Sequence, residues 1–121
     1  MTNNLIDLSK QFAVDVINFC DMLRGRKKAS VILSQLIRSG TSIGANIHEA
    51  SYASSRSDFV NKLQIALKEC NETSYWLDVF HDALVITDVE YLPMFNQCSK
   101  IRKLLVTSVN TAKENGTNKE V

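Results

Sequence analysis

Apolar residues recur at steps of three and four along most of the chain, which is the spacing of one helix face. In the first segment this stripe ends at Leu23, and Gly25 follows almost directly. Glycine just past the last apolar position is typical of a left-handed helix C-cap, so we expect a helix over residues 5–24. Its apolar face consists of Leu5, Leu8, Phe12, Val16, Phe19 and Leu23.

A second apolar stripe crosses the segment SQLIRSGTSIGANIHEA, where helix propensity and periodicity disagree. Glycine in a helix is less favourable than alanine by about 1 kcal/mol, and Ser and Thr compete for backbone hydrogen bonds. Periodicity nevertheless predicts one helix over residues 29–53. The small residues Gly40 and Gly44 then allow another helix to approach closely. A phosphate-binding loop is the alternative, although its final Gly-Lys-Ser/Thr is absent.

The third predicted helix has a start signal and the clearest apolar face. Ser55 and Asp58 have the spacing of a capping box directly before Phe59, so we place this helix at residues 56–86.

The fourth predicted helix is placed by a proline. Pro93 lacks a backbone N–H, which favours a position in the first turn, with Glu90 as N-cap. We expect this helix over residues 91–113, followed by a frayed polar tail over 114–121.

Four amphipathic helices with short links predict an all-α, antiparallel up-down-up-down four-helix bundle. No segment shows the period-two alternation of a strand. The 121 residues fit a single domain over residues 1–121, and 45% hydrophobic with 22% charged residues is typical of a folded domain.

The cysteines and the apolar runs predict a cytoplasmic protein without a membrane partner. Cys20, Cys70 and Cys98 are odd in number and lie within helical patterns, so disulfides are not expected. No secretory signal or 18-residue apolar run is present.

Charge is segregated although the net charge is only +1. Residues 24–38 contain five basic residues and no acid, whereas residues 69–90 contain six acids and no Lys or Arg. An antiparallel bundle brings these blocks together. Three accounts remain open: pairing within one chain, pairing between copies in a head-to-tail ring, or phosphate contacts. The candidate nucleic-acid-binding residues are Arg24, Arg26, Lys27, Lys28 and Arg38, together with Lys100, Arg102 and Lys103 on the fourth helix.

No catalytic or metal-binding motif is complete. His48 and Glu49 begin a zinc-protease motif, but residue 52 is Tyr. Asp78 and His81 have the spacing of half a di-iron site, and no second pair occurs. We therefore expect no catalytic residues, no metal, no cofactor and no enzymatic activity.

Asn46 stands among small and apolar residues, so we expect partial burial and a hydrogen-bond partner such as Glu49 or Glu72. A network that fixes helix register is one interpretation, and a binding role is the other.

The segments SGTSIGANIHEA and SDFVNKLQIALKECNETSYWL resemble the four-helix bundle proteins of the 23S rRNA intervening-sequence type. That family also includes the accessory variability protein of diversity-generating retroelements. The resemblance is strong over residues 36–77. Residue 50 is Ala where many members have Gly, and KEC at 68–70 replaces a version with small residues. The matching motif residues are Ser42, Ile43, Asn46, Ile47 and Glu49, followed by Phe59, Leu63, Ala66, Glu72 and Leu77.

This resemblance implies a homo-oligomeric ring, typically a homopentamer, without catalytic activity. It also implies RNA or DNA and a reverse transcriptase as partners, through a basic surface. The near-neutral charge of this chain leaves a second hypothesis open, a structural or protein-interaction ring that binds no nucleic acid.

Overall fold

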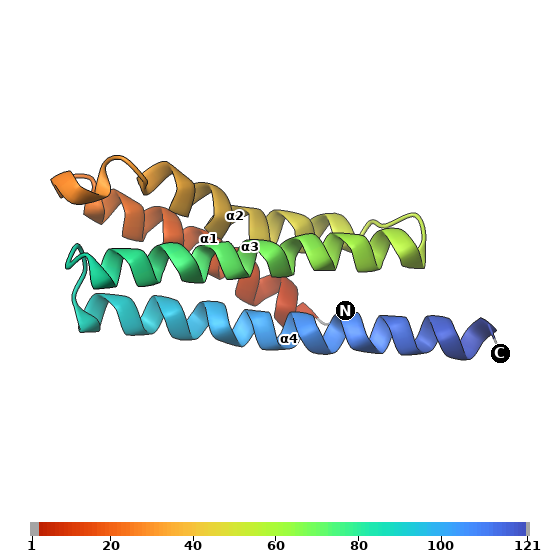
Figure 1. Ribbon diagram of the computed structural model, residues 1–121. Coiled ribbons are helices and arrows are strands. Elements are labelled where there is room, and N and C mark those ends of the chain that lie inside the picture. The colour runs from red at the N-terminus through yellow and green to blue at the C-terminus, as the bar shows by residue number, and fades with distance from the viewer. Residues whose placement is uncertain (1–2, 121) are drawn as a thin grey trace.

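Four helices and one short 3-10 turn make up the chain in the computed structural model, which describes residues 3–120, with side chains for residues 4–115. The elements are α1 (Asn3–Leu23), η1 (Lys27–Ala29), α2 (Leu33–Ala50), α3 (Arg56–Asp82) and α4 (Asp88–Glu120). Consecutive helices run in opposite directions (Figure 1). The predicted all-α up-down bundle is therefore confirmed.

The helices pack mainly with their neighbours in sequence. α2 lies against α1 and α3, and α3 lies against α4. α1 runs obliquely to the other three helices (Figure 1), and its contact with α4 is the least extensive of these pairings. Within residues 3–120, no helix is long and apolar enough to cross a membrane.

The core consists of the apolar stripes that the sequence predicts. Phe12 and Val16 of α1 are fully buried, as are Leu63 and Leu77 of α3. Leu8 is only half-buried, at the edge of the core. The other large side chains with almost no exposure are Leu5, Leu23, Leu36, Ile43, Ile47, Phe80, Ile101 and Leu105.

Two glycines of α2 determine how closely α1 approaches. A Cβ atom at Gly40 would lie 2.8 Å from both Cγ atoms of Val16, and one at Gly44 would lie 3.0 Å from the carbonyl oxygen of Ser9. Both distances are shorter than ordinary carbon contacts, so a larger residue would require α1 to move. The segment is helical throughout, which confirms the close-approach interpretation of these glycines.

The first residues of α3 confirm the predicted cap. Ser55 is the N-cap, and its Oγ accepts a hydrogen bond from the Asp58 backbone N–H at 3.1 Å. The Asp58 carboxylate accepts from the Ser54 N–H at 3.3 Å. These bonds use backbone donors that the first turn leaves unpaired.

The predicted start of the fourth helix was wrong. Thr87, not Glu90, precedes the first helical residue, and its Oγ1 accepts from the Glu90 N–H at 3.2 Å. The Glu90 carboxylate in turn accepts from the Thr87 N–H at 2.9 Å. The pair forms a reciprocal capping box that starts the helix at Asp88, three residues before the predicted residue 91. Pro93 consequently lies in the second turn, inside the helix.

The end of the first helix also differs from the prediction. No glycine among the described residues has a positive φ, so Gly25 does not form a left-handed cap. Instead, the Arg24 N–H bonds to the Asp21 carbonyl at 3.3 Å, and the Arg26 N–H bonds to the Leu23 carbonyl at 2.9 Å. Tight i to i+3 bonds therefore satisfy the last carbonyls without a left-handed residue.

A left-handed residue does occur at the end of α3, where it is Leu84 with φ 61°. The Leu84 N–H bonds to the His81 carbonyl at 3.1 Å, and the Val85 N–H bonds to the Phe80 carbonyl at 2.9 Å. This is a Schellman motif with leucine where glycine is usual. It ends α3 at Asp82, four residues before the predicted residue 86.

Two further predicted boundaries are corrected. The second helix begins at Leu33 and ends at Ala50 instead of covering 29–53, because consecutive i to i+3 bonds shape residues 26–32. The predicted frayed tail 114–121 is helical up to Glu120, and residue 121 lies outside the described residues. A helix already anchored by packing adds residues at little cost, which explains the extension.

Candidate functional site

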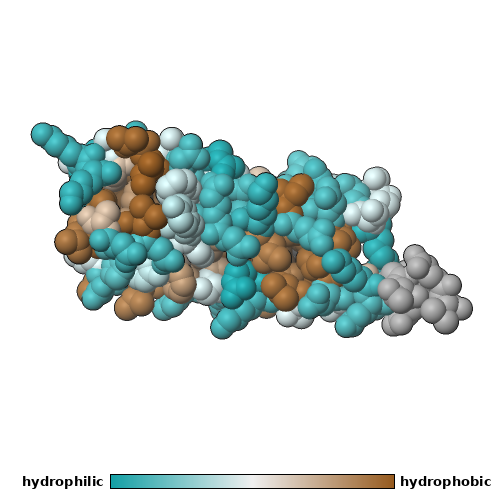
Figure 2. All heavy atoms as spheres, viewed as in Figure 1, coloured by the Kyte–Doolittle hydropathy of each residue, from teal (hydrophilic) through white to brown (hydrophobic). Residues whose placement is uncertain are grey.

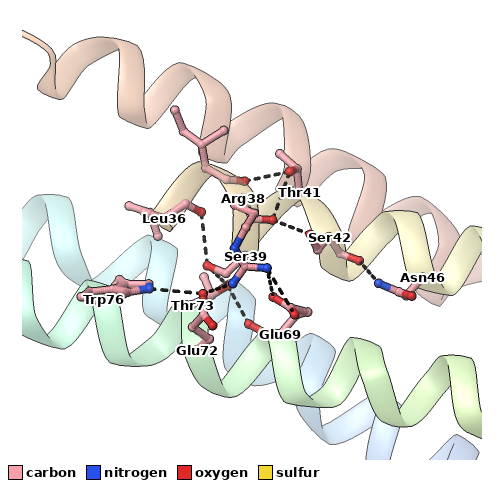
Figure 3. A network of polar contacts seen from close by, with 11 residues as sticks. Leu36, Arg38, Ser39, Thr41, Ser42, Asn46, Glu69, Glu72, Thr73 and Trp76 are labelled. Carbon is pink, nitrogen blue, oxygen red and sulfur yellow. Dashed lines mark hydrogen bonds and ion pairs between the residues drawn. The ribbon is translucent and has the colours of Figure 1, made fainter. Parts of the chain in front are cut away.

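The first polar cluster joins the middle of α2 to α3 (Figure 3). One guanidinium nitrogen of Arg38 lies 3.3 Å from the Glu69 carboxylate, and the other contacts Glu72. The Glu69 side chain is only 11% exposed, so its charge needs a partner. Trp76 donates its indole N–H to Glu72 at 3.4 Å. Arg38 thus pairs two acids of the block 69–90 within one chain.

Two buried hydroxyl groups lie beside this cluster. Thr73 Oγ1 lies 3.0 Å from Ser39 Oγ and 2.8 Å from the Glu69 carbonyl oxygen (Figure 3). Ser39 Oγ also lies 3.3 Å from the Leu36 carbonyl oxygen. A buried hydroxyl is costly without a partner, and here each has one. The contact fixes the register of α2 on α3.

The second cluster lies at the end of the bundle formed by residues 24–32 and 82–90, which we call the η1 end. The two guanidinium nitrogens of Arg26 lie 2.8 and 2.7 Å from the two carboxylate oxygens of Glu90. Arg26 also donates to the Val85 carbonyl at 2.8 Å. The hydrogen bond from Arg26, with a further contribution from Thr87, lowers the pKa of Glu90 to about 2.

The other basic residues near the η1 end differ in their partners. Lys28 donates to the Ala83 carbonyl at 3.2 Å, at the C-terminus of α3, where the helix dipole favours a cation. Arg24 pairs with Asp21 at 3.3 Å, with both side chains largely exposed. Lys27 has no ion-pair partner among residues 4–115. Pairing between the two charge blocks within one chain, the first of the three accounts, therefore holds for Arg26 and Arg38, whereas Arg24 pairs with Asp21 of its own helix.

The three basic residues of α4 form a separate group. Lys100, Arg102 and Lys103 are all exposed, and none forms an ion pair within the part of the chain whose side chains are described. Lys100 lines a groove of about 290 Å³ between α1 and α4, with Asp15 on the opposite side.

Asn46 does not have the predicted partners. Its side-chain amide donates to the Ser42 carbonyl at 2.8 Å, within α2 (Figure 3). Glu72 is paired with Arg38 instead, and Glu49 is exposed. The expectation of a bond to Glu49 or Glu72 was therefore wrong. A long helix offers its own carbonyls to such an amide at closer range than a neighbouring helix does.

An aromatic cluster that sequence reasoning missed joins the end of α3 to the start of α4. Tyr91 donates to Asp78, and its ring stacks on His81 with centroids 4.3 Å apart. His81 Nε2 lies 2.5 Å from Asp88 Oδ1. Burial and the bond to Asp78 raise the pKa of Tyr91 to about 12. Asp78 and His81 therefore have separate partners. The sequence feature that could have predicted this cluster is the placement of one acid and one ring on each side of the α3–α4 connection: Asp78 and His81 before it, Asp88 and Tyr91 after it.

The thiols lie in the core. Cys20, Cys70 and Cys98 are free and fully buried. Burial raises the pKa of Cys20 to about 11, and the adjoining Cys98 thiol together with burial raises that of Cys70. The reactive thiolate form of these two residues is thereby disfavoured.

Two grooves lie at the end of the bundle opposite the η1 end. They have volumes of about 540 and 330 Å³ and share Arg56 and Phe59. Arg56 is engaged with the Ala112 carbonyl at 3.2 Å. Within residues 4–115, no group of three His, Cys, Asp or Glu side chains is placed to hold a metal ion.

The comparisons with known proteins agree with this architecture. A family model described as 23S rRNA-intervening sequence protein matches residues 2–107. The chain belongs to this family. Among solved structures, this member of the 23S rRNA-intervening sequence protein family is similar to a protein of unknown function from the S23 ribosomal protein family of Bacteroides thetaiotaomicron. The two are 47% identical with a TM-score of 0.84, over 87% of this chain and 97% of the other. No curated protein matches the sequence.

The residues on which the family resemblance was based divide into a buried and a surface group. Ser42 bonds to the Arg38 carbonyl at 2.6 Å, Glu72 to Arg38, and Glu49 faces solvent. Phe59 is half-buried against the core. The fully buried members are Ile43, Ile47, Leu63, Ala66 and Leu77.

Proposed function

We propose that this member of the 23S rRNA-intervening sequence protein family is a non-enzymatic, homo-oligomeric adaptor, a ring of five copies in the cytoplasm. The observation that carries the proposal is the exposed apolar face of α1. Val14, Ile17 and Met22 are each about half exposed, at 45%, 53% and 48%. Val14 and Ile17 are neighbours one helix turn apart, and contiguous exposed apolar side chains are typical of protein contact surfaces. A second copy of the chain would cover them.

The absence of enzymatic activity is supported by the structural use of the polar side chains. Arg38 binds Glu69 and Glu72 of α3, Tyr91 binds Asp78, and Asp88 binds His81. His48 is exposed and lies against the ring of Tyr52, with centroids 5.2 Å apart. Catalysis needs a nucleophile or base free to meet a substrate, and these groups are engaged elsewhere.

The mass in solution tests the oligomer directly. Light scattering coupled to size exclusion should give five times the chain mass of 13.6 kDa at micromolar concentration. A second sample with Ile17→Lys should give a smaller particle, whereas Lys68→Ala on the exposed side of α3 serves as the control. A wild-type protein that runs as a monomer would overturn the proposal.

Nucleic-acid binding by the α4 basic group is a second candidate function. Lys100, Arg102 and Lys103 lie within four residues of one helix and are exposed without acidic partners among the described side chains. By contrast, Arg26 and Arg38 are engaged with carboxylates, which favours α4 over the block 24–38 as the surface for phosphates. The family description names 23S rRNA, and RNA is the first ligand to try.

Salt dependence separates phosphate binding from the alternative, a ring that binds only proteins. Affinity for a labelled 23S rRNA fragment or DNA duplex should fall steeply with salt, and its slope should decrease when Lys100, Arg102 and Lys103 are replaced by Ala. Arg26→Gln is the control, because that guanidinium is already paired. Absence of binding at low salt would leave the protein-interaction ring.

A reverse transcriptase is the protein partner that the family resemblance suggests. A pull-down with a retroelement reverse transcriptase and its template RNA should retain the enzyme on the wild-type protein. Loss of retention with the α4 triple variant would indicate a shared basic surface. Retention by neither protein would contradict this partner.

A further inference from the structure

The η1 end exposes apolar side chains from two separate hairpins. Val31 before α2, Leu84 after α3 and Val89 in α4 are 84%, 84% and 82% exposed, more than any other large apolar residue described. Figure 2 shows hydrophobic surface over the start of α2 and again near the α3–α4 connection. The bonds from Arg26 to Glu90 and from Lys28 to Ala83 hold the two hairpins side by side, so these residues share one end of the molecule.

Leu84 carries two energetic disadvantages in a single copy of the chain. Its φ of 61° is a conformation that suits glycine and strains a residue with a Cβ. Its side chain is also almost fully in water, so no burial within the chain offsets that strain. Strained backbone positions cluster at active sites, ligand clamps and switch regions. A partner surface that covers Leu84 would bury the apolar side chain that is exposed in a single copy.

The η1 end also carries charged residues of both signs that form no ion pair among the described side chains. Lys27 is exposed and has no carboxylate within ion-pair distance among the described side chains, and Asp82 likewise has no cation. Asp88 is 81% exposed beside His81. In a head-to-tail ring, the unpaired cation of one copy can pair with the unpaired anion of the next.

We propose that the η1 end is the contact between copies of this chain, with Leu84 and Val89 of one copy on Val31 of the next and Lys27 of one copy paired with Asp82 of the other. This inference rests on the proposed homo-oligomer and adds the η1 end to the α1 face as a region of contact between copies. It also assigns a role to Lys27 that does not require nucleic acid. Because the Arg26–Glu90 pair joins the two hairpins within one copy, their contact residues already lie side by side before the copies meet.

Charge exchange between two variants is the decisive test, measured by sedimentation velocity. Lys27→Glu alone and Asp82→Lys alone should each weaken self-association by about tenfold or more, because like charges then meet at every contact. Mixing the two variants, each with its own fluorescent label, should restore association between them. Pairing within one chain cannot produce this rescue, so its absence would overturn the interface.

A hydrophobic variant tests the same surface without charge exchange. Leu84→Glu also places a residue with a Cβ in the left-handed conformation, and it puts a charge where Leu84 would be buried. Self-association should therefore be lost while the helical circular dichroism stays unchanged. Tyr52→Glu is the control, since Tyr52 is 77% exposed at the opposite end. A wild-type monomer would overturn the proposed function as well, whereas a wild-type oligomer that tolerates Leu84→Glu would overturn only this interface.

Discussion

The middle of the α1–α2 contact and the η1 end differ in how residue type matches the local structure. In the middle, the absence of a side chain at Gly40 allows Val16 to approach closely, and both residues are buried. At the η1 end, a full-sized leucine occupies a position that favours glycine, and its side chain remains in water. One region gives up helix propensity for packing within the chain, and the other exposes a leucine side chain that no burial within the chain stabilises. Only the exposed leucine at the η1 end calls for an explanation that involves another molecule.

The largest effect is expected in the middle of the bundle, from Gly40→Ala. The free energy of unfolding should fall by up to about 2 kcal/mol, because an overpacking cost of about 1–3 kcal/mol is only partly offset by the gain of about 1 kcal/mol in helix propensity. Val16 cannot turn away easily, since a β-branched side chain in a helix has one favoured rotamer. Urea unfolding monitored by circular dichroism measures the change.

Two comparisons sharpen that prediction. Combined with Val16→Ala, the Gly40→Ala cost should be smaller than in the wild-type background, because the clashing Cγ atoms are gone. Gly25→Ala should be nearly neutral, since a Cβ at Gly25 would meet no atom within 4 Å. Additive losses in the double variant would show that close approach to Val16 is not the reason for glycine.

A smaller effect is expected at the η1 end from Glu90→Gln. The variant removes the charged partner of Arg26 and weakens the capping box, so unfolding should become easier by about 1 kcal/mol. Asp21→Asn, which removes the exposed partner of Arg24, should change stability by less than about 0.5 kcal/mol. Equal losses in the two variants would contradict the structural role of the Arg26–Glu90 pair.

The pH dependence of stability provides an independent probe of the same pair. The pKa of Glu90 is lowered from 4.5 to about 2 in the folded protein, chiefly by the hydrogen bond from Arg26. Its contribution is therefore complete above pH 4.5 and is lost as the pH falls toward 2. The stability difference between wild type and Glu90→Gln should shrink over that window. A constant difference from pH 6 to pH 2 would contradict the assignment.

The smallest expected effect is a gain, from Leu84→Gly. At a protein concentration low enough for the chain to be monomeric, relief of the left-handed strain should exceed the greater unfolded-state entropy of glycine and raise the free energy of unfolding by about 0.5 kcal/mol. Leu84→Ala keeps the Cβ and should bring little gain. If alanine stabilised the protein as much as glycine, exposure of the leucine rather than its backbone would be the cause.

The same contrast separates what the sequence could predict from what it could not. The spacing of Phe12, Val16 and Ile43 predicts their burial, because periodicity reports directly on one helix face. Ser55 and Asp58 predict the α3 cap because all partners lie within four residues. Such features can be predicted from sequence because they depend on residues that are close together along the chain.

The errors arose where more than one local solution was available. Thr87 and Glu90 have the spacing of a capping box, but reading Pro93 as a first-turn residue moved the start of α4 by three residues. Gly25 permits a left-handed conformation without requiring it, while Leu84 adopts one because its turn joins two packed helices. The partners of Arg26 and Asn46 depended on helix positions that charge blocks and burial patterns do not specify.

The concentration dependence of thermal unfolding tests the central claim, that copies of the chain associate through the η1 end. Association stabilises the folded state by mass action, so the Tm of the wild-type protein should rise as its concentration increases. The Tm of Leu84→Glu should be independent of concentration and should match the wild-type value at high dilution. A Tm that does not change with concentration in either protein, or that rises equally in both, would contradict the account.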